Sequence, residues 1–115
     1  MDKMQELLDD LYLVCQPIML CSRANVIDGY EILLRSTKLR AFPEKMFLWF
    51  IEKDERNARL MAYYFRELKK LVDKHSNTNL SLNLHPQQLQ HPSTWAFLDN
   101  ISSMRENVSI ELTEH

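Results

Sequence analysis

Three strand-like segments of this sequence each carry one oxygen-bearing side chain among alternating aliphatic residues. The segments cover residues 29–35, 80–84 and 108–114. Their oxygen-bearing side chains Glu31, Asn83 and Glu111 occupy comparable positions in the three segments. Carboxylate and amide oxygens are the hard ligands that Mg²⁺ and Mn²⁺ prefer. The pattern therefore predicts a candidate divalent-cation site built from three separate strands.

The alternation also divides each segment into two faces. In segments 80–84 and 108–113, leucine, valine and isoleucine alternate with serine, asparagine, glutamate and threonine. In segment 29–35, one face would carry Gly29, Glu31, Leu33 and Arg35. A strand of a β/α barrel turns its apolar face to the helices and its other face to the barrel interior. A half-exposed sheet whose polar face meets water fits the same spacing, so the pattern leaves both arrangements open.

Two further strands are expected in the first third of the chain. After a short helix over residues 2–11, the apolar run 11–20 predicts a strand that Pro17 restricts to a sheet edge, because proline cannot donate a ladder hydrogen bond. Residues 23–25 are predicted to turn the chain into a second strand over 26–35, antiparallel to the first. Asp28 and Gly29 predict either a bulge or a close backbone approach in this strand.

Helices and strands alternate in the rest of the chain. Helical patterns cover residues 44–52 and 55–74, with Asp54 as the expected N-cap of the second. The strand 80–84 is followed by a short helix or turn that Pro86 starts and that extends to residue 90. A helical piece over about 91–103 and the strand 108–113 come next. Alternation of this kind is typical of parallel strands joined by helical crossovers, and the length allows one domain.

Composition excludes several classes of protein. Gly29 is the only glycine, so no glycine-rich phosphate-binding loop can be built. The net charge is −2 and no long Lys/Arg run is present, which argues against direct nucleic-acid binding. Lys69, Lys70 and Lys74 are read as a solvated helix face.

Cysteine content and hydropathy indicate a reduced, cytoplasmic setting. Cys15 and Cys21 lack both the number for a disulfide framework and the spacing for a zinc site. The N-terminus lacks the features of a signal peptide, and no window approaches the ~18 apolar residues of a membrane span. No membrane association is therefore expected.

Four motifs of the chain resemble, in order and approximate spacing, the first half of an EAL domain, the cyclic di-GMP phosphodiesterase family. They are Gln-Pro-Ile at 16–18, Gly-Tyr-Glu-Ile-Leu-Leu-Arg at 29–35, Ser-Leu-Asn-Leu at 81–84 and Ile-Glu-Leu-Thr-Glu at 110–114. The signature triplet reads Glu-Ile-Leu instead of Glu-Ala-Leu. Each motif alone is weak, but four in the right order form a strong resemblance.

The resemblance implies a fold, a ligand and a role for each matched residue. The fold would be the first half of a (β/α)8 TIM-type barrel with an antiparallel first strand, truncated after about the fourth strand. Mg²⁺ or Mn²⁺ would be held by Glu31, Asn83 and Glu111, of which the two glutamates would be catalytic. Cyclic di-GMP would be contacted by Gln16, Leu33 and Arg35, and Glu114 would support a functional loop. The ions would polarise a phosphodiester oxygen and activate water.

The sequence departs from the family in its second half. A complete β/α barrel takes ~250 residues, and the paired aspartates and the lysine that family members carry further along are absent here. Three ligands alone would hold a divalent cation loosely, so catalysis by this chain alone is not expected. Open sheet edges would in turn favour a protein partner or a homo-oligomer, and about one in four of the aromatic side chains is assigned to such an interface.

Three hypotheses about function follow. The first is a regulatory protein-binding module of cyclic di-GMP signalling that is non-catalytic alone. The second is a phosphodiesterase half whose metal-dependent site is completed by another chain or by a C-terminal segment. The third is an unrelated small α/β interaction module.

Overall fold

The computed structural model describes residues 2–20 and 22–113. The chain forms, in order, α1 (Lys3–Asp9), β1 (Leu11–Leu20), β2 (Arg23–Ser36), α2 (Glu44–Glu52), α3 (Asp54–Lys74), β3 (Leu80–Leu84), the 3-10 helix η1 (Pro86–Gln90), α4 (Pro92–Ile101), the 3-10 helix η2 (Ser102–Met104) and β4 (Val108–Leu112). No helix in this described part is long and apolar enough to cross a membrane.

The four strands form one mixed sheet in the order β1-β2-β3-β4. β1 runs antiparallel to β2, whereas β2, β3 and β4 are parallel to one another. Within the described residues β1 pairs with β2 only, so Pro17 lies on an edge strand as predicted. The topology is that of a mixed α/β protein and is consistent with a partial barrel-like fold.

The second strand begins earlier than the sequence predicts. Residues 23–25 belong to β2 and are not the turn, because Arg23 already pairs with Leu20 across the hairpin. At Gly29 both predicted alternatives occur. The consecutive residues Ile18 and Met19 of β1 pair with Gly29 and Ile27 of β2. Asp28 is therefore skipped in the pairing and forms a bulge. The backbone is also approached closely, since a Cβ on Gly29 would stand 2.8 Å from the carbonyl oxygen of Asn79.

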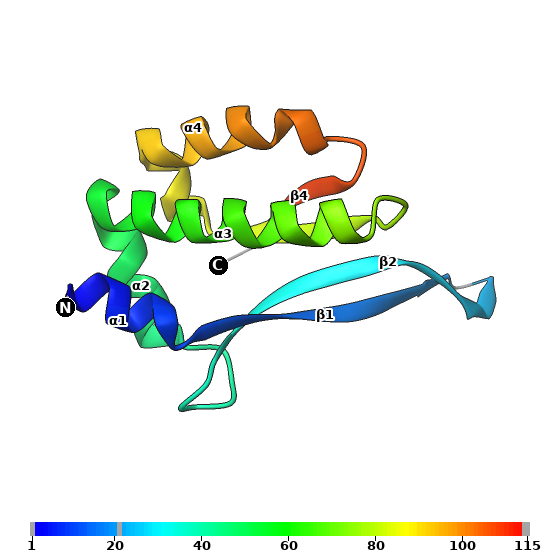
Figure 1. Cartoon of the computed structure of the whole chain (residues 1–115), viewed down its shortest axis with the longest axis horizontal. Coiled ribbons are helices and arrows are strands. Elements are labelled where there is room, and N and C mark those ends of the chain that lie inside the picture. Colours follow the sequence, from blue (N-terminus) through cyan, green and yellow to red (C-terminus); the bar gives the residue numbers. More distant parts are fainter. Residues whose placement is uncertain (1, 21, 114–115) are drawn as a thin grey trace.

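The apolar face of the sheet is covered by helices. Ile32 and Leu34 of β2 and the three leucines of β3 are buried and belong to one core cluster with residues of α2, α3 and α4. α3 packs against both α2 and α4, and Figure 1 shows it running along the length of the molecule between α4 and the β1–β2 hairpin. The opposite face of the sheet carries the predicted polar residues and is described below.

A buried polar network connects α3 to the segment that follows β3. Asn57 is fully buried, and its amide nitrogen donates to the hydroxyls of Ser93 and Thr94, both at 2.8 Å. The Gln88 amide nitrogen donates to the Asn57 oxygen at 3.1 Å. Asp54 is the first residue of α3 and not its N-cap. Its carboxylate instead accepts the backbone N–H of Ser93, which holds the pKa of Asp54 below its usual value.

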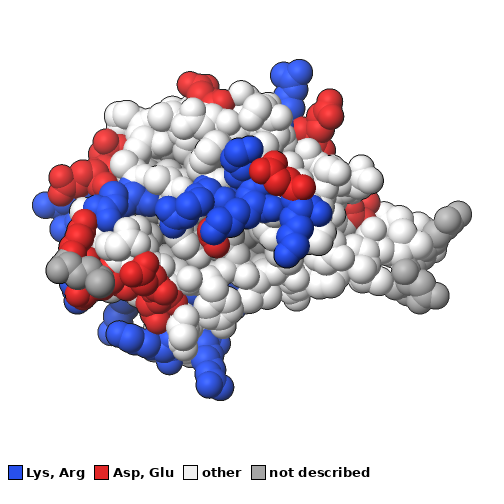
Figure 2. Space-filling model, viewed as in Figure 1, with Lys and Arg blue, Asp and Glu red and all other residues white. Residues whose placement is uncertain are grey.

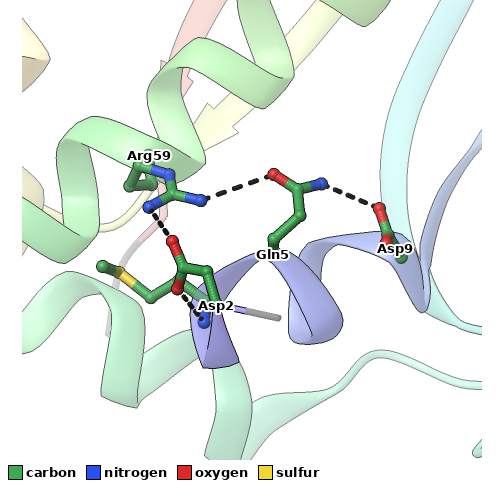
Figure 3. Close-up of polar contacts among 5 residues, drawn as sticks. Asp2, Gln5, Asp9 and Arg59 are labelled. Atoms are coloured by element: carbon green, nitrogen blue, oxygen red, sulfur yellow. Dashed lines mark hydrogen bonds and ion pairs between the residues drawn. The ribbon is translucent and has the colours of Figure 1, made fainter.

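Helix α1 is attached to α3 by polar contacts. The Arg59 guanidinium donates to the Asp2 carboxylate at 2.7 Å and also reaches Gln5, which in turn bonds Asp9 (Figure 3). Other basic side chains line the outer surface of α3, where Figure 2 shows them as a band across the molecule. Lys69 and Lys70 are exposed and pair with acidic neighbours of the same helix, which is the behaviour of a solvated face.

Candidate functional site on the polar face of the sheet

The three predicted oxygen donors lie on adjacent strands and on the same, helix-free face. In the register of the sheet, Glu31 stands beside Ser81, and Asn83 stands beside Glu111. The Asn83 amide nitrogen donates a hydrogen bond of 3.1 Å to a carboxylate oxygen of Glu31. Glu31 and Asn83 are half-buried and Glu111 is exposed. The alternation read from the sequence thus brings these side chains into neighbouring positions.

The donor set suits a hard cation in type but supplies few ligands. Two carboxylates and one amide oxygen are available, and Mg²⁺ and Ca²⁺ take six or more oxygen ligands. Among residues 2–20 and 22–113, no group of three or more His, Cys, Asp or Glu side chains is placed to hold a metal ion. Glu31, Asn83 and Glu111 would therefore hold a divalent cation only together with ligands from water, substrate or another polypeptide segment.

The residues expected to bind substrate lie along β1 and β2. Gln16 faces Glu31 directly across the β1–β2 ladder and is exposed. Leu33 and Arg35 follow Glu31 at two-residue steps, so all three point to the same side of β2. One guanidinium nitrogen of Arg35 donates to the carbonyl of Leu34 at 2.8 Å. Glu114, the expected loop-supporting residue, lies outside the described residues.

A cleft of about 670 Å³ opens where the parallel strands end. Of the predicted residues, Leu33, Arg35 and Asn83 line it, whereas Gln16, Glu31 and Glu111 lie on the open face beside it. The carboxyl ends of barrel strands are where β/α barrels build their sites. The predicted set is thus divided between a cleft and an adjoining polar surface.

Part of the cleft wall was not foreseen from the sequence. Phe42, Phe47 and Leu48 line it, and all three come from the loop after β2 and the first half of α2. Their position in the chain could have predicted this role, because the loops that follow barrel strands form the functional end of such folds. Their aromatic and aliphatic character alone is what a core residue would also show.

His85 lines the same cleft and caps the helix that follows β3. Its Nδ1 accepts the backbone N–H of Gln87 at 3.0 Å, as expected for a capping residue. Because Nδ1 is an acceptor, the neutral ring carries its proton on Nε2. Within the described residues, Nε2 of His85 has no hydrogen-bond partner and remains available to a ligand.

Two solved structures resemble this chain in fold. The complex of Klebsiella pneumoniae BlrP1 with calcium and cyclic di-GMP superposes with a TM-score of 0.60 at 24% identity, over 91% of this chain and 27% of that one. The BlrP1 complex with manganese and cyclic di-GMP gives a TM-score of 0.50 at 21% identity, over 93% of this chain and 32% of that one. The fold of this chain is EAL-like.

The other comparisons are negative, and the likeness is partial in length. No protein-family model matches the chain, and no curated protein matches it. The chain spans about a third or less of the length of the BlrP1 chains that it resembles. Identities of 24% and 21% indicate shared fold, so cyclic di-GMP and metal binding are properties of the BlrP1 complexes and enter below only as proposals.

Proposed function

We propose that this chain acts in cyclic di-GMP signalling as a regulatory module that binds a protein partner, and that it does not hydrolyse the dinucleotide by itself. One observation carries the proposal. The polar face gathers Glu31, Asn83 and Glu111 on an EAL-like sheet, but it offers only two carboxylates and one amide oxygen, and the nitrogen of that amide donates to Glu31. Three oxygen ligands are too few for tight binding of a divalent cation, which takes six or more.

Hydrolysis of a phosphodiester bond would require metal ligands, a phosphate-binding group and a group that orients water on this face. A bound divalent cation would supply polarisation of a phosphodiester oxygen and a more acidic water. Glu31, Asn83 and Glu111 would hold such an ion, and Arg35 would pair with a phosphate through its remaining N–H groups. None of the described residues of the cleft offers a lysine that could orient an attacking water. Weak binding without turnover is the expected result.

A second candidate function is that of a phosphodiesterase half whose site another polypeptide segment completes. It is favoured by the same-face arrangement of Glu31, Asn83 and Glu111, because a regulator that never uses metal has no need of it. The two candidates differ in one property. Only the enzyme half would depend on Glu31 for its effect.

Hydrolysis and binding assays separate the two candidates. The purified chain with Mg²⁺ or Mn²⁺ should give no linear dinucleotide above a protein-free control, and calorimetry should find weak or absent binding of cyclic di-GMP. Turnover that disappears in Glu31→Ala would establish the enzyme half. A submicromolar Kd for cyclic di-GMP, about −8 kcal/mol or tighter, would contradict the expectation of weak binding.

A cellular assay tests the regulatory role directly. The wild-type chain and the Glu31→Ala variant are expressed separately in a bacterium whose swimming responds to cyclic di-GMP. The expected result is altered swimming with both, since the effect does not pass through the metal ligands. Unchanged swimming with both proteins would refute a role in this signalling.

A further inference from the structure

The segment between β2 and the middle of α2 combines exposed apolar side chains with positive charge. Leu39, Phe42 and Leu48 are 65%, 45% and 42% exposed, although apolar side chains of this size are usually buried. Between residues 35 and 48 the basic residues outnumber the acidic ones by four to one. They are Arg35, Lys38, Arg40 and Lys45, against Glu44. This local excess of positive charge contrasts with the net charge of −2 for the chain.

The same segment forms one wall of the cleft at the end of the strands. Phe42 and Phe47 pack with their ring centroids 5.3 Å apart, and Leu48 lies beside them in the cleft wall. Arg35 lines the cleft, and no carboxylate of the described residues pairs with its guanidinium. The cleft is therefore lined by apolar side chains, by the cation of Arg35 and by the carboxylate of Glu44, which does not pair with Arg35. The Nε2–H of His85 adds a further donor.

The loop that borders the cleft is held in place by the end of α1. The Ser36 hydroxyl donates to one carboxylate oxygen of Asp10 at 2.5 Å, and the backbone N–H of Lys38 donates to the other at 3.1 Å. The backbone carbonyl of Asp10 accepts the N–H of Thr37 at 2.7 Å. Three contacts from one residue fix the course of the loop, so the apolar side chains that follow are presented in a set arrangement.

Arg40, within this loop, has a left-handed backbone. Its φ is 54°, and it is the only residue other than glycine with a positive φ in the described part of the chain. Such a conformation costs about 1 kcal/mol or more and persists only where the surroundings enforce it. Here the turn after β2 enforces it, since the N–H of Arg40 donates to the carbonyl of Ser36 at 2.7 Å and the N–H of Ser36 donates to the carbonyl of Ala41 at 2.9 Å.

We propose that this cleft docks a segment of a protein partner in which an aliphatic or aromatic side chain is flanked by carboxylates. The apolar side chain would enter between Phe42, Phe47 and Leu48. The carboxylates would pair with Arg35 in the cleft lining and with Lys38 and Lys45 of the same segment of the chain. The inference rests on the protein-binding part of the proposed function and names the chemistry of the partner.

Charge complementarity and shape favour a peptide over a membrane. An acidic segment matches the excess of Lys and Arg around the cleft (Figure 2 shows basic groups projecting at the lower edge, where the loop after β2 lies in Figure 1). A bilayer is a flat surface and cannot reach Arg35 and His85 inside a concave cleft, whereas a side chain of a peptide can. Lipid vesicles are accordingly one arm of the test.

The test is a selection of phage-displayed random dodecapeptides on the full chain, with the Leu48→Glu variant as counter-selection. Peptides with an apolar residue between Asp or Glu residues should be enriched. Synthetic copies should bind the wild-type chain, and their binding should weaken at least about tenfold with Leu48→Glu or Arg35→Gln. Val26→Glu is the matched control, since it places the same charge on an exposed aliphatic residue at the other end of β2.

Several results would overturn the docking site. The selection could yield no peptide that distinguishes the wild-type chain from Leu48→Glu, or its peptides could share a basic consensus sequence. Val26→Glu could weaken peptide binding as much as Leu48→Glu does. The chain could also bind phosphatidylglycerol vesicles, and not peptides, in a way that depends on Leu48. A dimer by light scattering that Leu48→Glu dissociates would assign the cleft to a second copy. Thermal melts followed by circular dichroism verify that each variant folds. If Leu48→Glu does not fold, Arg35→Gln replaces it in the counter-selection.

The failure of the docking site and the failure of the proposed function are distinguishable. If the docking site is wrong, peptide selection fails while altered swimming remains. If the role in signalling is wrong, swimming is unchanged even where acidic peptides bind and the binding depends on Leu48. If both hold, Leu48→Glu abolishes the swimming effect and Val26→Glu preserves it.

Discussion

Asn83 on β3 donates its amide hydrogen to the carboxylate of Glu31 on β2 at 3.1 Å. The bond joins two residues that are 52 positions apart in the sequence. It arises because parallel pairing sets Glu31 beside Ser81, which is two residues from Asn83 and on the same face of β3. It places a neutral donor where a second carboxylate would repel Glu31. The polar face can therefore persist without a cation.

Asn83→Asp should convert this contact into a repulsion. Two half-buried carboxylates side by side favour the neutral form of one of them, so the free energy of unfolding at neutral pH should fall by about 1–2 kcal/mol. Added Mn²⁺ or mild acid should restore it. Urea unfolding measures the effect, and Asn100→Asp on the exposed surface of α4 should change stability by less than about 0.5 kcal/mol. No response of the variant to Mn²⁺ would mean that the two side chains cannot share an ion.

Gly29→Ala should destabilise the sheet. The new Cβ would stand 2.8 Å from the carbonyl oxygen of Asn79, which also accepts the N–H of Tyr30 and cannot move without weakening that bond. A loss of about 1–3 kcal/mol in the free energy of unfolding is expected. Asp28→Ala, one residue away in the exposed bulge, is the control and should be nearly neutral. Equal effects of the two substitutions would show that the close approach is relaxed in solution.

The attachment of α1 should depend on pH through Asp2. The hydrogen bond from Arg59 holds the pKa of Asp2 below its ordinary value, so its contribution is present above that ordinary value and is lost as pH falls through the lowered one. The protection factors of the α1 amides, which correct for the pH dependence of intrinsic hydrogen exchange, should fall in acid. Asp2→Asn should show fast exchange already at neutral pH, whereas Glu6→Gln in the same helix should behave as wild type. Unchanged exchange in Asp2→Asn would mean that packing alone holds α1.

Tyr63 should lower stability in alkali. Burial raises the pKa of its hydroxyl to about 12, and the buried oxygen has no hydrogen-bond partner among the described residues. Stability is fully present below the ordinary tyrosine pKa and is lost as pH rises through the raised value, because the unfolded chain ionises first. Tyr63→Phe should be neutral or stabilising near neutral pH and should unfold at higher pH than wild type. A loss above about 1 kcal/mol at neutral pH would reveal a partner for the hydroxyl.

Local patterns in the sequence were sufficient to predict the elements and their faces. The bounds of β1 and α2, the edge position that Pro17 requires, and the side of each strand that carries Glu31, Asn83 and Glu111 all follow from periodicity and backbone chemistry within a few residues. These properties depend on interactions between near neighbours in the chain. The roles assigned to the site residues remain predictions.

The contacts that make a site depended on the tertiary structure. No pattern in the sequence pairs Arg59 with Asp2, directs Asp10 onto Ser36, or brings Phe42 and Leu48 of one crossover beside His85 of another. Such contacts depend on how α1, α2 and η1 pack at the carboxyl ends of the strands, and packing is decided by shape and burial summed over the whole core. The alternation of residues therefore determined which side chains face the open surface, and only the packing of the crossovers decided which of them share a cleft.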